Sequence, residues 1–88
     1  MKLEIRYSGV AYKYVRKRGL QGEVREAVRK YALHLTRKGK LVDVTKLYGK
    51  WQGYYRMRLG DLRIILKPYI ADGYVYIKRV GPRGDVYK

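Results

Sequence analysis

The sequence predicts an α+β fold in which two N-terminal helices pack against an antiparallel sheet. Apolar and polar residues alternate over residues 3–7 and again over residues 54–68, and apolar residues recur at helical spacing from residue 20 to residue 35. These periods of about 2 and 3.6 residues are those of a half-buried strand and of an amphipathic helix. The 88 residues have room for one domain with a thin core, which we expect to span residues 1–88.

The N-terminal half predicts one strand followed by two helices. The strand ends at Ser8-Gly9, and a short helix over residues 10–18 ends at Gly19. The second helix is expected over residues 21–37, and Gly39 just beyond it is the glycine expected to terminate it. Its apolar stripe, which we interpret as core because a small domain must cover its sheet, consists of Leu20, Val24, Ala27, Val28, Tyr31, Ala32 and Leu35.

Residues 41–53 have no regular period, so we predict an irregular connection there. Leu47 and Trp51 are its expected apolar anchors, and Gly49 and Gly53 are its expected turn points. We assign no chemistry to this segment.

Residues 54–68 predict a β-hairpin. Gly60-Asp61 suits a two-residue turn, and that turn fixes the register of the two strands. One face of the hairpin is then apolar and should receive the long helix, through Tyr55, Met57, Leu59, Leu62, Ile64 and Leu66. On the other face, which we expect to be exposed and concave, the pairs are Arg58 with Arg63, Arg56 with Ile65, and Tyr54 with Lys67.

A second turn at Asp72-Gly73 predicts a further strand over residues 74–80. Parity places Tyr76 and Lys78 on the cationic face, and Val75 and Ile77 on the core face. Strict alternation would point Arg79 into the core. We therefore expect a β-bulge at Arg79, or a strand that has already left the sheet there.

The charge of the chain indicates an anionic partner. Lys and Arg number 22 against 7 Asp and Glu, which gives a formal net charge of +15. A heat-adapted surface would interleave both signs, and a membrane-binding surface would favour residues that insert, whereas this chain has 11 Tyr, one Trp and no Phe. Two arginines facing each other across a hairpin lower stability by roughly 0.2 to 1 kcal/mol, so a polyanion such as RNA is the favoured ligand.

Several classes of protein are excluded by composition. The chain has no cysteine, so it has no disulfide, thiolate metal site or cysteine nucleophile, and a reducing cytoplasmic location is expected. No apolar run reaches the length of a signal peptide or a membrane span. His34 is the only histidine, which we interpret as structural or solvated, and the acidic residues are scattered. We therefore expect neither a metal nor any other cofactor.

Two segments resemble the RelE family of toxins. Residues 55–65 read YRMRLGDLRII, and residues 80–87 read VGPRGDVY. The family pairs a basic hairpin ending Gly-Asp-x-Arg with a final Val-Gly-x-Arg-x-x-Val-Tyr, and the chain is similar to archaeal-type RelE-like mRNA interferases of the RelE/ParE superfamily. The two motifs in this order, after a strand and helices of suitable length, cover nearly the whole chain.

The resemblance implies a fold, an activity and two partners. The fold is βααβββ, and the activity is metal-independent cleavage of messenger RNA by an endoribonuclease bound in the ribosomal A site, against 16S-type ribosomal RNA. The second partner is a cognate acidic RelB-like antitoxin. No membrane and no small-molecule cofactor are implied.

The resemblance also assigns roles by position. Arg63 matches the arginine that stabilises charge at the scissile phosphate, Arg83 the arginine near the leaving group, and Tyr87 the proposed general base. Arg56 and Arg58 stand where well-known members have lysines; they can bind phosphate but are poor proton donors, because arginine holds its proton above about pH 12. Together with Lys67 and Lys78 on the same face, they are the expected RNA-binding residues.

The residues present agree with one route to RNA cleavage. The 2′-hydroxyl must lose its proton, attack the phosphate in line and form a more negative phosphorane. A mechanism with two histidines is excluded, and arginine and tyrosine remain; positive charge nearby lowers the pKa of a tyrosine from about 10, as a base requires.

Two non-enzymatic alternatives remain open. One is a ParE-like toxin, which shares this fold and acts on DNA gyrase, and the other is an RNA-binding accessory protein. ParE-like chains typically lack the full catalytic set, so the presence of Arg63, Arg83 and Tyr87 together favours the endoribonuclease.

Overall fold

The computed structural model describes residues 4–37 and 44–82, with the side chains of residues 32–37 not included. In chain order the elements are β1 (Glu4–Tyr7), α1 (Gly9–Lys17), α2 (Gln21–Arg37), β2 (Val44–Lys46), the 3₁₀ turn η1 (Gly49–Trp51), β3 (Tyr55–Leu59), β4 (Leu62–Tyr69), η2 (Ile70–Asp72) and β5 (Tyr74–Pro82). The predicted strand at the N-terminus, both helices, the hairpin and the last strand are therefore confirmed. Gly39 lies outside the described residues.

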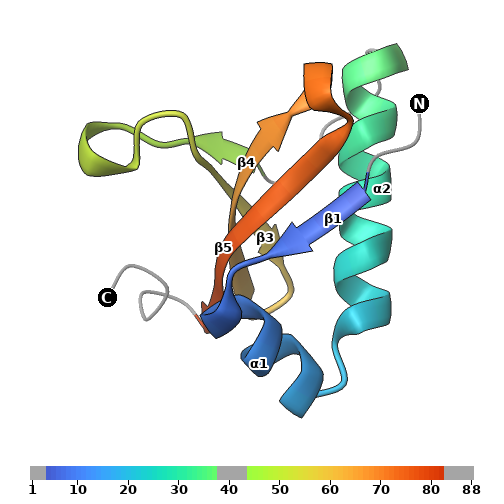
Figure 1. Cartoon of the computed structure of the whole chain (residues 1–88), viewed down its shortest axis with the longest axis vertical. Helices are drawn as coiled ribbons and strands as arrows, with labels where there is room; N and C mark the ends of the chain where they lie inside the picture. The colour runs from blue at the N-terminus through green and yellow to red at the C-terminus, as the bar shows by residue number, and fades with distance from the viewer. Residues whose placement is uncertain (1–3, 38–43, 83–88) are drawn as a thin grey trace.

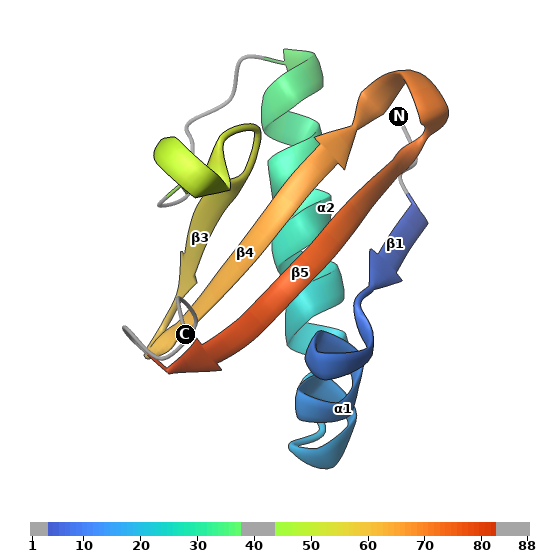
Figure 2. The same ribbon diagram turned by 60° about the vertical axis from the view of Figure 1, so that its left-hand side comes forward.

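The molecule has two layers. The five strands form one sheet in the order β1-β5-β4-β3-β2, and both helices pack on the same face of it (Figure 1, Figure 2). The sheet is antiparallel, as predicted, except at one edge, where β1 pairs with β5 in parallel. A parallel neighbour requires a long crossover connection, and the helices that follow β1 begin that connection.

The segment predicted to be irregular contains an additional strand. β2 is only three residues long and pairs with β3 at the edge of the sheet, and η1 follows it. Three residues are too few to show alternation, which is why the sequence does not reveal this strand. Gly49 and Gly53 adopt positive φ angles, as the predicted turns require. Leu47 and Trp51 are half-buried and lie outside the main core cluster.

The predicted register of the hairpin is confirmed. Leu59 pairs with Leu62, and Arg58 pairs with Arg63, on either side of the turn in which Gly60 has a φ of 61°. Of the residues predicted to be buried, Met57, Ile64 and Leu66 are fully buried, and Tyr55 is half-buried against them. The register set by this turn therefore places apolar residues on one face of the hairpin and cationic residues on the other, as the alternation indicates.

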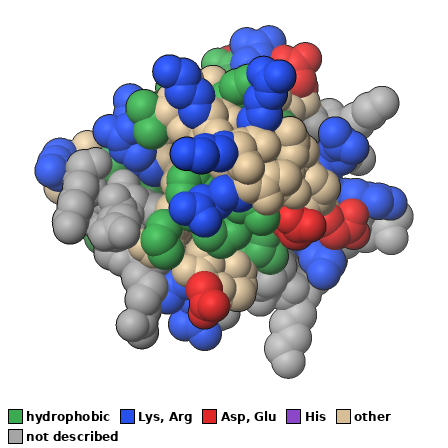
Figure 3. All heavy atoms as spheres, turned by 90° about the horizontal axis from the view of Figure 1, so that it is seen from below, with side chains coloured by type: hydrophobic (Ala, Val, Ile, Leu, Met, Phe, Trp, Pro, Cys, Tyr) green, Lys and Arg blue, Asp and Glu red, His purple; other side chains and the backbone are tan. Residues whose placement is uncertain are grey.

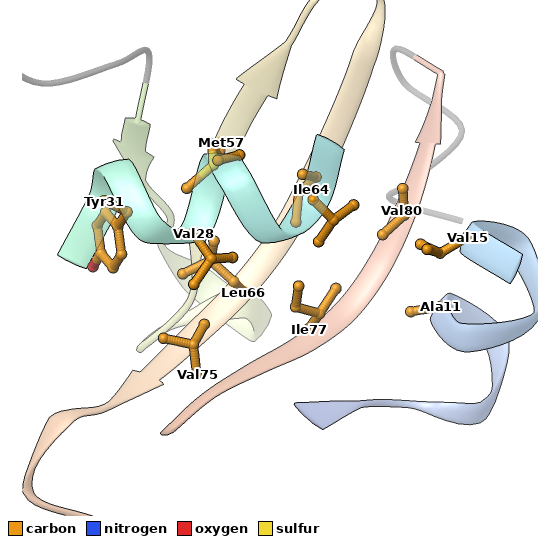
Figure 4. Packing of buried hydrophobic residues seen from close by; sticks show 12 residues of the cluster. Ala11, Val15, Val28, Tyr31, Met57, Ile64, Leu66, Val75, Ile77 and Val80 are labelled. Carbon is orange, nitrogen blue, oxygen red and sulfur yellow. The ribbon is translucent and has the colours of Figure 1, made fainter. Parts of the chain in front are cut away.

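The core lies between this apolar face and the helices (Figure 4). The helical stripe supplies Val24, Ala27, Val28 and Tyr31, all buried, and Leu20 packs against them in part. Burial raises the pKa of Tyr31 to about 12. The side chains of Ala32, His34 and Leu35, for which core or solvated positions are predicted, lie outside the described residues.

A β-bulge interrupts β5 at the predicted place. Ile65 pairs with Arg79 but Leu66 pairs with Ile77, so Lys78 is one residue more than the ladder accommodates. Ile77 and Val80 consequently both reach the core although they are three residues apart. Arg79 lies opposite Ile65 and away from the core, in agreement with the prediction of a bulge.

Ser8 joins the bulge to the first helix. Its hydroxyl accepts a hydrogen bond from the N–H of Ala11 at 3.1 Å and donates one to the carbonyl of Lys78 at 2.6 Å. Its backbone N–H donates to the carbonyl of Ile77 at 2.9 Å. One residue thus caps α1 and satisfies the carbonyl that the bulge removes from the ladder.

We expect Ser8→Ala to lower the free energy of unfolding by about 1–2 kcal/mol, since it removes the cap of α1 and a partner of a partly buried carbonyl. Urea unfolding followed by circular dichroism measures this change. Ser8→Thr keeps the hydroxyl and serves as the matched control. Equal unfolding midpoints for Ser8→Ala and the parent would show that the bulge is not anchored by this hydroxyl.

Candidate nucleic-acid interface

The candidate site is the face of the sheet that the helices leave uncovered. The register and the contacts between neighbouring strands put one set of side chains there, which we call the outer face: Glu4, Arg6, Thr45, Tyr54, Arg56, Arg58, Arg63, Ile65, Lys67, Tyr69, Tyr74, Tyr76 and Arg79. Lys and Arg side chains also spread widely over the view of the molecule in Figure 3, where acidic side chains occupy only a few places.

Four arginines gather at the hairpin end of the outer face, and we call Arg56, Arg58, Arg63 and Arg79 the arginine cluster. Arg58 lies opposite Arg63 on neighbouring strands, and Ile65 lies between Arg56 on one side and Arg79 on the other. The cluster is therefore spread over the three central strands β3, β4 and β5. Like charges so arranged repel one another, and an anion placed among them would relieve the repulsion.

Hydrogen bonds to neighbouring strand residues hold two members of this cluster in position. An Nη atom of Arg63 donates to the carbonyl of Leu62 at 3.2 Å, and an Nη atom of Arg56 donates to the hydroxyl of Thr45 at 3.4 Å. Arg63 is half-buried and forms no ion pair within the described part of the chain. Its remaining N–H groups suit the oxygens of a phosphate, to which guanidinium donates in a planar fork.

A hollow of about 570 Å³, open to solvent, lies beside the hairpin turn. The described residues that line it are Arg58, Gly60, Asp61, Arg63 and Pro82. On β5 the residue opposite Arg63 is Gly81, which has no side chain to fill this end of the outer face. Part of the predicted concave face, at the turn where Arg58 and Arg63 face each other, is therefore hollowed.

The other end of the outer face is made of tyrosines and cations. The Nζ of Lys67 lies 5.6 Å from the ring centroid of Tyr54 and 5.4 Å from that of Tyr69, and the rings of Tyr69 and Tyr74 stack at 4.7 Å. The guanidinium of Arg6 lies 4.0 Å from the centroid of Tyr74. Cation–π contacts already engage Lys67, so it contributes positive potential here rather than an unoccupied ammonium group.

Arg6 also pairs with an acidic residue. Its Nε lies 2.6 Å from a carboxylate oxygen of Glu4, and this hydrogen bond raises the pKa of Arg6 above its ordinary value. Both groups are exposed, so the pair adds little to stability. The net positive potential of the outer face is consequently concentrated toward the arginine cluster.

The predicted site residues fall into two groups. Arg56, Arg58, Arg63 and Lys67 lie on the outer face, as expected from parity. Lys78 is the extra residue of the bulge and has no partner in β4, so its place on this face stays a prediction. Arg83 and Tyr87 lie outside the described residues, so their roles remain predictions; Arg83 directly follows Pro82 in the chain, and Pro82 lines the hollow.

Two features of the outer face were not assigned to the site from the sequence. Ile65 is fully buried although it belongs to the cationic face. The alternation of apolar and polar residues assigns Ile65 to that face but does not indicate that it is buried there. The bulge places Arg79 in the arginine cluster. The break in the alternation at Arg79 is the feature of the sequence that indicates this position. The centre of the site is therefore apolar, with guanidinium groups around it.

The described residues contain no group of three His, Cys, Asp or Glu side chains placed to hold a metal ion. Among these same residues, no helix is long and apolar enough to cross a membrane. What the outer face offers chemically is positive charge and hydrogen-bond donors.

The fold and this face together define a basic α+β protein with a cationic sheet face on which neither of its described helices packs. Its sequence matches no protein-family model and no curated protein. Its structure, however, matches solved toxins. It is similar to a chain of the archaeal RelE-RelB complex from Pyrococcus horikoshii OT3, with 28% identity and a TM-score of 0.64 over 97% of this chain and 99% of that chain.

Two further solved structures are similar over almost their full length. The toxin-antitoxin complex RelBE2 from Mycobacterium tuberculosis matches with 22% identity and a TM-score of 0.60, over 97% of this chain and 95% of that one. The DinJ-YafQ toxin-antitoxin complex of E. coli matches with 21% identity and a TM-score of 0.61, over 100% of both chains. The chain therefore has the RelE-like fold, as the sequence motifs predict.

Proposed function

We propose that this protein is the toxin of a type II toxin-antitoxin system, and that it is a metal-independent endoribonuclease that cleaves messenger RNA in the ribosomal A site. The observation that carries the proposal is the pair of opposed arginines, Arg58 and Arg63, beside an open hollow on the uncovered face of a RelE-like fold. The site of action would be the cytoplasm.

In this mechanism the 2′-hydroxyl of the message attacks the adjacent phosphate. Arg63 would stabilise the negative charge that develops on the phosphorane, Arg83 would act near the leaving oxygen, and Tyr87 would accept the proton of the hydroxyl. Arginines that keep their protons act here as electrostatic donors and not as acids. Such a site depends on good positioning of the RNA, which supports a role for the ribosome in holding the message.

The RNA-binding part of the proposal rests on the remaining cations of the outer face. Arg56 and Arg58 would hold phosphates of the message, while Lys67 and Lys78 extend the positive potential along the sheet. The 16S-type ribosomal RNA is a second polyanion that this surface would meet in the A site. Both contacts should weaken as salt is added, because each phosphate contact releases counterions.

Primer extension on a translated message tests the activity. After induction of the protein we expect new 5′ ends inside the codons of actively translated messages, and no such ends when initiation of translation is blocked. Growth arrest without any new ends would contradict the nuclease. In that case inhibition of DNA gyrase, measured by supercoiling of plasmid DNA, would identify a ParE-like toxin instead.

An acidic antitoxin is the proposed second partner. The three similar structures described above are complexes named for a toxin and an antitoxin, and a net charge of +15 on 88 residues attracts a polyanionic chain. We expect co-expression with the product of a neighbouring acidic gene to abolish growth arrest. The affinity of the two purified proteins should fall as salt rises; an affinity insensitive to salt, or unchanged growth arrest, would contradict this prediction.

A further inference from the structure

Arg79 occupies a position that neither the motifs nor the proposed mechanism uses. Building on the proposed function, we infer that Arg79 is a further phosphate-binding residue, which the β-bulge in β5 holds on the outer face for the backbone of a bound RNA. Its ligand would be a phosphodiester group, and Ser8 would act as the residue that positions the bulge.

The first support is the register. Ile77 and Val80 are both buried in the core, so regular alternation through Lys78 would leave no place for Arg79 on the outer face. The extra residue of the bulge restores Arg79 to that face, opposite Ile65 and across it from Arg56. The result is a cation on each side of a buried apolar residue, one row of the sheet from Arg63 and Gly81.

The second support is that the bulge is held firmly from outside the strand. The backbone N–H of Ser8 binds the carbonyl of Ile77 at 2.9 Å, and its hydroxyl binds that of Lys78 at 2.6 Å. Ser8 is itself fixed as the cap of α1 through Ala11. The backbone that carries Arg79 is thus tied to a helix whose residues Ala11 and Val15 are fully buried, which pre-organises this arginine for a ligand.

The third support is an unsatisfied donor. The Nε of Arg79 is buried and has no hydrogen-bond partner, and within the described part of the chain Arg79 forms no ion pair. A buried charged donor without an acceptor is unfavourable, because its hydration is lost and nothing replaces it. An arginine with a purely structural role would be expected to donate to a carbonyl or a carboxylate. A phosphate bound at the accessible part of this half-buried side chain would give the guanidinium a charge-assisted acceptor.

The test uses RNA binding without cleavage. The probe is a short single-stranded RNA with 2′-O-methyl groups, which cannot attack its own phosphates, and its affinity is measured by fluorescence anisotropy over a range of salt concentrations. The variants are Arg79→Gln, which removes the charge, and Arg79→Lys, which keeps it without the planar fork. Arg25→Gln is the matched control, because Arg25 is exposed on α2, on the other side of the sheet.

For Arg79→Gln we expect weaker binding and a salt dependence of log K reduced by about 0.7, the value of one phosphate contact to a single strand. Arg79→Lys should keep most of the salt dependence but bind several-fold more weakly, because it loses the bidentate geometry. Arg25→Gln should match the parent in both. Equal salt dependence for Arg79→Gln and Arg25→Gln would overturn the inference. So would a loss of antitoxin affinity without any loss of RNA affinity, which would assign Arg79 to the protein partner.

A second measurement keeps the inference testable if a variant unfolds. In the parent, the Nε–H proton of Arg79 should exchange slowly with water because the atom is buried, so it should be visible in ¹H–¹⁵N spectra. Titration with the same RNA should shift this resonance. A resonance that stays in place while those of other arginines shift would overturn the inference. Neither measurement depends on cleavage, so failure of the nuclease proposal on ribosomes would be recognised separately.

Discussion

Tyr87→Phe should abolish most cleavage while leaving RNA binding intact. The substitution removes only the hydroxyl, and with it the proposed general base, so cleavage of a ribosome-bound message should fall by about 10² to 10⁴. The variant keeps the aromatic ring, and it leaves the proposed phosphate contacts of the arginine cluster unchanged. Single-turnover cleavage on ribosomes programmed with a defined message measures the loss, and anisotropy with an uncleavable RNA measures the binding.

Tyr48→Phe is the matched control for this experiment, because Tyr48 is 74% exposed and lies just before η1, outside the arginine cluster. It should cleave at the parental rate. If Tyr87→Phe also cleaves at that rate, another group accepts the proton of the 2′-hydroxyl. If Tyr87→Phe loses binding to the same extent as cleavage, the residue holds the RNA and its role as a base is contradicted.

Leu66→Ala should bring the protein close to unfolding. Leu66 is fully buried in the centre of β4, where it packs between the sheet and α2, and truncation of such a side chain costs about 2–5 kcal/mol. A domain of this size has only about 5–15 kcal/mol of stability in total. Urea unfolding should therefore show a much lower midpoint with a similar slope.

Val10→Ala provides the comparison, because Val10 is 59% exposed at the start of α1. Removing its methyl groups should change the free energy of unfolding by less than about 0.5 kcal/mol. A small effect of Leu66→Ala, similar to that of Val10→Ala, would mean that the core is not organised around the hairpin.

The sequence predicts those parts of the fold that are set by local pattern. The Gly60-Asp61 turn fixes the pairing of Arg58 with Arg63, and helical spacing gives α2 its observed bounds of Gln21–Arg37. The parts of the fold that the sequence does not reveal are those that depend on contacts between residues distant in the chain. The parallel pairing of β1 with β5 and the edge strand β2 have no local signal, because strand order and a three-residue pairing do not appear in a periodic pattern.

The same distinction holds for the site. Parity alone places Arg56, Arg58 and Arg63 on one face, and the structure agrees. Parity also indicates that the alternation must break near Arg79. It does not indicate which residue is the extra one in the bulge, or which residue anchors the bulge. The hydrogen bond from Ser8 to Lys78 joins residues 70 positions apart, and no spacing in the sequence indicates it.

The bulge in β5 also behaves as a one-residue insertion. If Lys78 were absent, Ile77, Arg79 and Val80 would follow one another as core, outer and core positions of a regular strand. β5 therefore carries one additional cation outside the ladder, and every paired residue keeps its face of the sheet. The presence or absence of this one residue would therefore change the number of positive charges on β5 without changing which of its side chains stabilise the core.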